Sequence, residues 1–157
     1  MNSPADNAPS ESERLFLSVR SAVSDRHAIL EDDGFAVLLY LTSPTDTKPA
    51  ADCFVYSVVP PTEELVTPHG TSGPPILLRR FASEVALQPN IPANAHRFEF
   101  SPDGHSVAVF IRGEPWAFIA RDERRGFSKN ISAVGPFGQP WSQQLFDDLF
   151  PIDRNAS

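Results

Sequence analysis

Residues 96–120 (HRFEFSPDGHSVAVFIRGEPWAFIA) constrain the fold more than any other segment of this chain. They contain three short runs of strand-forming residues separated by two turn sequences. The first turn, Ser101-Pro102-Asp103-Gly104, has proline second and glycine fourth, an arrangement that favours a type I turn. The second turn contains Gly113 and reverses the chain in the same way. The pattern predicts three consecutive antiparallel strands near residues 96–100, 105–112 and 115–120.

The middle strand of this meander is apolar on both faces. Val107, Val109 and Ile111 share one face, and Ala108 and Phe110 share the other. A strand that is apolar on both sides is covered on both sides. The meander therefore requires a packed layer on each of its faces.

Three segments have the spacing of amphipathic helices. Ser10 and Glu13 have the form of a capping box, and the apolar residues that follow predict a helix over 11–28. Pro75 precedes a segment in which pairs of apolar residues alternate with pairs of polar residues. This pattern predicts a helix over 75–87, with a strand through 76–81 as the alternative. Pro140 precedes WSQQLFDDLF, whose apolar stripe predicts a last helix that Pro151 ends.

Two further apolar runs, at 35–42 and 54–59, predict an antiparallel pair joined by a long loop. The expected order is helix, strand, strand, helix, three strands and helix. This order predicts an α+β fold in which an antiparallel sheet of about five strands is packed by three helices. We expect a flexible tail over 1–9, a single domain over 10–151 and a C-terminal tail over 152–157.

Charge and composition narrow the classes of partner. The 157-residue chain has a net charge of −7, which argues against general nucleic-acid binding and against anionic membrane surfaces. A basic protein partner or a cation fits this charge better, and the preferred alternative is that the charge only keeps a small protein soluble. The 11 arginines against 2 lysines suggest a bacterial origin.

The N-terminal sequence lacks the basic start and apolar stretch of a signal peptide, and no run reaches transmembrane length. Cys53 is the only cysteine, so an internal disulfide is excluded and a buried, inert thiol is expected. We therefore expect a cytoplasmic protein.

Known catalytic and metal-binding motifs are missing from the sequence. The histidines lack zinc-site spacing, and no Cys-x-x-Cys, nucleophile elbow, phosphate loop or dinucleotide fingerprint is present. We expect no metal and no cofactor. Asp103 and His105 flank Gly104, and either the carboxylate orients the imidazole or the pair is an ordinary turn aspartate beside a solvent-exposed histidine. The second reading is preferred, because aspartate is common in such turns. A serine nucleophile assembled by the fold stays open.

The Ser101–Gly104 turn and its aromatic flanks resemble one hairpin of a β-propeller repeat. The resemblance covers about 20 residues in a single copy, whereas a propeller has several blades. We interpret it as shared turn chemistry.

The missing chemistry favours a small, acidic, non-catalytic protein-binding module, either monomeric or homodimeric. One form is an immunity-type protein that occludes a basic toxin. The other is similar to a secretion chaperone, a resemblance that rests only on the order helix, hairpin, helix and sheet. The partner contacts predicted for either form are Glu63, Glu64, Asp147, Asp148 and Trp141.

The alternative is a small-molecule- or peptide-binding domain, with or without catalysis, whose pocket lies between the sheet and a helix. The polar residues predicted for that pocket are His96, Asp103, His105 and Arg112.

Overall fold

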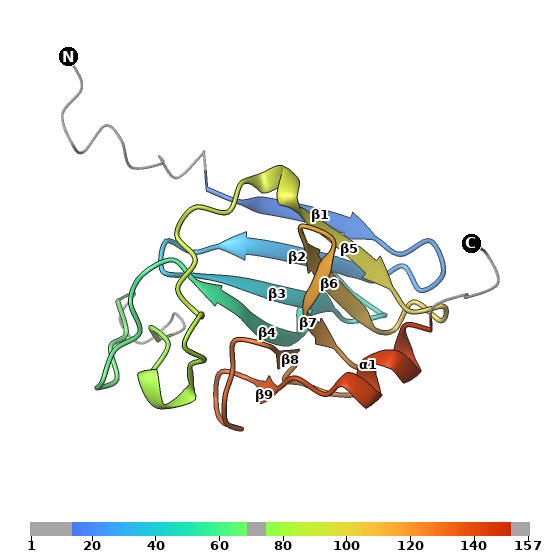
Figure 1. Ribbon diagram of the computed structural model, residues 1–157. Helices are drawn as coiled ribbons and strands as arrows, with labels where there is room; N and C mark the ends of the chain where they lie inside the picture. Colours follow the sequence, from blue (N-terminus) through green and yellow to red (C-terminus); the bar gives the residue numbers. More distant parts are fainter. Residues whose placement is uncertain (1–13, 69–74, 152–157) are drawn as a thin grey trace, which may run out of the picture.

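Two β-sheets face each other in the structure, a computed structural model that describes residues 14–68 and 75–151 (Figure 1). Both sheets follow the order of the chain, and their strands are antiparallel except for the last pair of the second sheet. The first sheet contains β1 (Phe16–Arg20), β2 (His27–Asp32), β3 (Ala36–Thr42) and β4 (Pro49–Ser57). The second contains β5 (His96–Phe100), β6 (Val107–Ile111), β7 (Glu114–Ile119), β8 (Phe127–Ser128) and β9 (Gln139–Pro140). One α-helix, α1 (Gln143–Leu149), and two 3-10 turns, η3 (Arg79–Phe81) and η4 (Ala93–Ala95), complete the described part.

The central core lies between the two sheets. Alternate residues of β2, β3 and β4, such as Leu30, Leu39 and Val55, meet Val109 and Ile119 of the second sheet. All five side chains are completely buried. Each contributes about 1.5–3 kcal/mol by leaving water, so this layer holds the sheets together.

Helix α1 covers the outer face of the second sheet. Phe118 stacks on Phe127 with ring centroids 4.8 Å apart, and Phe146 of α1 and Phe150, which follows the helix, pack against Phe118. Strand β6 is thus buried on both faces, as its sequence predicts.

The outer face of the first sheet is covered only in part. Residues 77–86 and 131–137 pack over Phe54 and Ala36, and the cluster that they form reaches no residue of β1 or β2. Phe16, on β1, is 62% exposed.

The expected α+β class with three helices is wrong. The described residues form two sheets and a single helix of 7 residues. The meander over 96–120 is confirmed as β5, β6 and β7, but it does not pair with the earlier strands. The expected single sheet is instead two, because the chain crosses to the opposite layer between β4 and β5.

The helix expected over 11–28 is instead β1, a turn and the start of β2. Leu15 and Leu17 both pack on the central core, so the period of this segment is two. The turn closes with a hydrogen bond from Ser21 N to Arg26 O. The proposed capping box at Ser10 and Glu13 lies outside the described residues.

Residues 75–87 form neither the expected helix nor the alternative strand. The backbone of this segment bonds to other parts of the chain: Leu77 O accepts from Thr62 N, and Ser83 N donates to Asn130 O. Leu77 and Leu78 are both buried, whereas Val85 is 65% exposed. The apolar pairs of residues 75–87 therefore belong to an extended segment that covers β4. The only helical turn in this segment is η3.

The last helix is confirmed in a shorter form. The hydroxyl of Ser142 caps it by accepting from Leu145 N at 3.3 Å. Pro140, expected to start this helix, belongs to β9. Residues 54–57 of the apolar run expected at 54–59 belong to β4, which begins earlier, at Pro49, and ends at Ser57.

Candidate functional site

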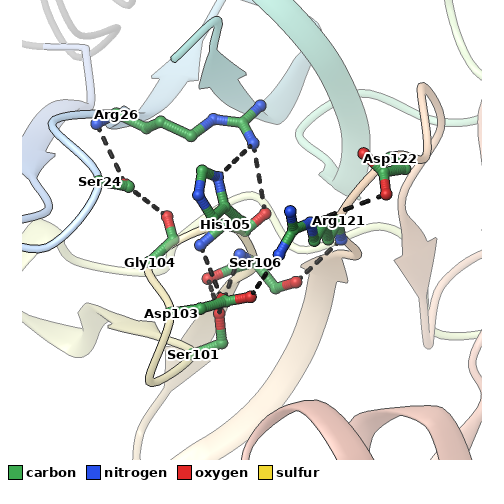
Figure 2. Close-up of polar contacts among 9 residues, drawn as sticks. All are labelled: Ser24, Arg26, Ser101, Asp103, Gly104, His105, Ser106, Arg121 and Asp122. Carbon is green, nitrogen blue, oxygen red and sulfur yellow. Dashed lines mark hydrogen bonds and ion pairs between the residues drawn. The ribbon is translucent and has the colours of Figure 1, made fainter.

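The Asp103 carboxylate stabilises the turn between β5 and β6 (Figure 2). Its Oδ1 accepts from the Ser101 hydroxyl at 2.6 Å and from the backbone N–H of His105 at 3.0 Å, and its Oδ2 pairs with Arg121 at 3.2 Å. The Ser101 hydrogen bond is the main cause that lowers the pKa of Asp103 to about 2. Asp103 makes no hydrogen bond to the imidazole of His105, so this geometry lacks a carboxylate–histidine dyad.

The imidazole of His105 meets Arg26 instead, which comes from the turn between β1 and β2 (Figure 2). Nη1 of Arg26 lies 3.4 Å from Nδ1 of His105, and Nε donates to the carbonyl of Thr42 at 2.7 Å. Arg26 is buried, and burial lowers the pKa of its guanidinium. Because a guanidinium only donates, Nδ1 of His105 accepts this bond.

A direct contact joins the same two turns. The hydroxyl of Ser24 donates to the carbonyl of Gly104 at 2.6 Å. A Cβ on Gly104 would lie 2.6 Å from Oγ of Ser21, and φ at Gly104 is +75°. The glycine is therefore required both by the backbone conformation and by the close approach. We call this contact between the two sheets the turn clamp (Ser21, Ser24, Arg26, Gly104 and His105).

His96 and Arg112 lie at the other end of β5. His96 is buried, with Nε2 at 2.8 Å from the Tyr56 hydroxyl and Nδ1 at 3.1 Å from the carbonyl of Ala93. Since a carbonyl only accepts, Nδ1 carries the proton and Nε2 accepts from Tyr56. Arg112 is exposed in the turn between β6 and β7. The four residues predicted for one pocket therefore form two separate groups, His96 with Arg112 and Asp103 with His105.

A cavity of about 600 Å³ does lie between the second sheet and α1, but none of those four residues lines it. Its apolar part comes from Phe110, Phe146 and Phe150. The guanidinium of Arg97 lies 4.1 Å from the centre of the Phe110 ring. The remaining polar lining consists of Glu99, Glu114, Lys129, Gln143 and Asp147.

The predicted partner contacts do not form one surface. Glu63 and Glu64 follow β4 and are exposed, and Glu63 pairs with Arg79. Asp147 and Asp148 are exposed on α1, which Figure 1 places at the opposite end of the molecule. Trp141 packs on Phe118 with ring centroids 5.1 Å apart. Its side chain is half-buried against the aromatic cluster beneath α1, so only part of it is available to a partner.

Sequence reasoning missed a cavity of about 360 Å³ on the outer face of the first sheet. Its floor consists of alternate residues of β3 and β4, with Leu38 opposite Phe54 and Tyr40 opposite Asp52. We call it the Tyr40 cavity. Its full lining is Asp33, Ala36, Leu38, Tyr40, Asp52, Phe54, Pro75, Arg125, Pro136 and Phe137.

Carboxylates surround the aromatic floor of this cavity. Burial, followed by the charges of Glu31, Asp52 and Asp33, raises the pKa of Tyr40 to about 12. Asp52 is paired with Arg125, whose Nη1 lies 2.9 Å from both carboxylate oxygens. Asp33 forms no ion pair with any described residue, and its Oδ1 accepts from the amides of Phe35 and Ala36.

The apolar surface continues from this cavity toward the edge of the sheet. Ile29 of β2 lies directly opposite Tyr40 and is half-buried. Phe16 of β1 points to the same side, opposite Glu31. Alternation along β3 would have been the signal for this face, but the run at 35–42 is apolar on both sides and does not reveal which face is open.

No family model, curated protein or solved structure matches this chain. Within residues 14–68 and 75–151, His, Cys, Asp and Glu side chains form no group of three that could hold a metal ion. None of the helices in this part is long and apolar enough to cross a membrane. Cys53 is completely buried, and burial raises the pKa of its thiol.

Proposed function

We propose that this protein is a non-catalytic protein-binding module whose outer face on the first sheet binds a basic segment of a partner protein. The observation that carries the proposal is the Tyr40 cavity, which combines an apolar floor with the carboxylate of Asp33, whereas Asp52, its other carboxylate, is paired with Arg125. Its volume of about 360 Å³ lies at the lower end of the range of ligand pockets and leaves room for one long side chain.

A lysine or arginine side chain matches this cavity in both of its parts. Its aliphatic stem would lie along Leu38 and Phe54, and its charged head would meet Asp33 and the ring of Tyr40. The net charge of −7 attracts basic partners over a longer range and accelerates their association. Four exposed carboxylates contribute to that long-range attraction: Glu63, Glu64, Asp147 and Asp148. Because they are well hydrated, direct ion pairs with a partner would add little to affinity.

Of the two forms considered, the immunity-type protein acting in the bacterial cytoplasm keeps its support, since it rests on charge. The similarity to secretion chaperones rested on the order helix, hairpin, helix and sheet, which the fold does not have. An immunity-type protein would insert a basic side chain of its toxin into the Tyr40 cavity.

The test uses a labelled peptide, Gly-Ser-Lys-Gly-Arg-Gly-Ser, and a second peptide in which glutamate replaces lysine and arginine. We expect the basic peptide to bind the full chain with a Kd of about 100 μM or below in fluorescence anisotropy, and the acidic peptide not to bind. Asp33→Asn keeps the oxygen that accepts the two backbone amides and removes the charge. It should weaken binding about fivefold.

Asp46→Asn is the matched control. Asp46 also accepts a backbone amide, that of Lys48 at 2.8 Å, but it lies outside the Tyr40 cavity. Equal affinity for the two peptides, or equal affinity of wild type and Asp33→Asn, would overturn the proposal.

The second candidate function is a small-molecule- or peptide-binding domain that uses the cavity beneath α1. The observation in its favour is the volume of about 600 Å³, which lies within the range of ligand pockets. A ligand there should shift the ring NMR signals of Phe110 and Phe146. A fragment screen that leaves these signals unchanged would remove this candidate.

A further inference from the structure

The turn clamp lies beside a separate cavity of about 300 Å³. Arg26 and His105 line it from the clamp, and residues 121–124 line it from the segment after β7. Three arginines and two carboxylates line this space, and Asp103, which lies outside the lining, pairs with Arg121. Arginines are therefore concentrated here, although the whole chain has a net charge of −7.

Arg26 is the unusual member of this lining. It is only 8% exposed, yet it forms no ion pair within the part of the chain that the structure describes. Its Nε and Nη1 bond to neutral partners, the carbonyl groups of Thr42 and His105 and the imidazole of His105. Its Nη2 bonds to no described residue, as Figure 2 shows for the residues drawn. Burial lowers the pKa of Arg26 despite the attraction of the more distant carboxylates of Asp122 and Asp103, and a buried cation without a direct ion pair is costly unless an anion joins it.

The other two arginines differ in their availability. Arg121 is held by Asp103 at 3.2 Å and by Asp122 at 3.7 Å (Figure 2). The side chain of Arg124 is exposed and makes neither an ion pair nor a hydrogen bond with the described residues. Arg26 and Arg124 therefore offer donors to a ligand, whereas Arg121 is engaged.

We propose that this cavity binds a single carboxylate group, with Arg26 and Arg124 as its donors. A carboxylate carries one negative charge and is therefore repelled less by Asp122 and Glu123 than a phosphate dianion would be. This site is separate from the Tyr40 cavity in position and opposite to it in preferred charge, so the inference does not depend on the proposed function.

The experiment titrates the ¹⁵N-labelled full chain with acetate, N-acetylglycinate and the neutral N-acetylglycinamide, with chloride keeping the ionic strength constant. Both carboxylates should cause saturable shifts of the amides of His105 and Arg124, with a Kd of about 10 mM or below, and the neutral amide should not. Tighter binding of N-acetylglycinate than of acetate would identify a peptide C-terminus as the source of the carboxylate. Equal binding would identify a small free acid.

Arg124→Gln should weaken carboxylate binding about tenfold without changing the fold, because its side chain is exposed. Arg80→Gln removes the same charge from an exposed arginine outside the cavity and should leave binding unchanged. Asp33→Asn should also leave it unchanged, which separates this inference from the proposed function. Shifts that the neutral amide reproduces, or an unchanged Kd in Arg124→Gln, would overturn the inference.

Discussion

The hydroxyl of Tyr56 donates a hydrogen bond of 2.8 Å to Nε2 of His96, and this bond joins the two sheets. Tyr56 belongs to β4 and His96 begins β5. The two rings meet edge to face, with centroids 5.9 Å apart. With Nδ1 bonded to the carbonyl of Ala93, the imidazole is held in one neutral tautomer.

Acidification should destabilise the protein through His96. Burial lowers the pKa of His96 below its ordinary value of 6.5. The unfolded chain therefore binds a proton before the folded chain does, and the free energy of unfolding falls as the pH drops below about 6.5. Urea unfolding followed between pH values of about 8 and 5 should show this loss, and His96→Gln should flatten it. An identical pH dependence in the two proteins would contradict this assignment.

Gly104→Ala should be the more damaging of two turn substitutions. The added methyl group would press against Ser21 and Ser24, and the residue would keep its strained φ of +75°. We expect a loss of about 2–4 kcal/mol in urea unfolding.

Gly113→Ala is the matched control for this substitution. Gly113 has a similar φ of +82°, but a Cβ there would meet nothing within 4 Å. Its cost should be limited to the backbone strain, about 1 kcal/mol. Equal losses for the two variants would show that the turn clamp adds nothing to stability.

Cys53 should resist thiol reagents in the folded protein. Its side chain is completely buried, its Sγ lies 3.4 Å from the carbonyl of Phe127, and burial raises its pKa. Because the thiolate is the reactive form, labelling should proceed only through unfolding. The rate of reaction with a chromogenic disulfide should rise with urea in parallel with the unfolded fraction, and rapid labelling of the folded chain would contradict this picture.

Replacing Glu63, Glu64, Asp147 and Asp148 together with serine should act mainly on long-range attraction. These side chains are exposed and lie outside the Tyr40 cavity. The variant should bind the basic peptide with a weaker dependence on salt, and near 0.15 M salt its Kd should change less than that of Asp33→Asn. If the four substitutions abolish binding at that salt concentration, the acidic residues themselves make the contact and the Tyr40 cavity does not.

The meander was predictable because its turns carry strong local signals, whereas the first hairpin carries none. The turn at residues 21–26 contains neither glycine nor proline, and Asp25 takes the left-handed conformation, with φ of +64°. Leu15 and Val19 also fit a helical period, since a short apolar segment can satisfy both the helical spacing of about 3.6 residues and the strand spacing of two. Local pattern alone therefore placed a helix there.

The candidate sites depend on contacts between distant parts of the chain. The Tyr40 cavity combines β3 and β4 with Arg125 and Phe137, and Asp52 meets Arg125 across a parallel bridge. Neither that bridge nor the approach of Arg26 to His105 has a signature in the local sequence. The sequence did identify the turn at 101–104, where Asp103 stabilises the backbone as expected of a turn aspartate.

The turn clamp also has a consequence for the order of folding. Ser24 and Gly104 are 80 residues apart in the chain, so their bond can form only after the turn between β5 and β6 has met the turn between β1 and β2. Closing so long a loop costs conformational entropy before the contact can stabilise the chain. Folding should therefore be slow relative to a helical protein of this size. The first hairpin can pair early with β3 of its own sheet, but its turn is joined to the second sheet only when residue 104 has been synthesised and folded against it.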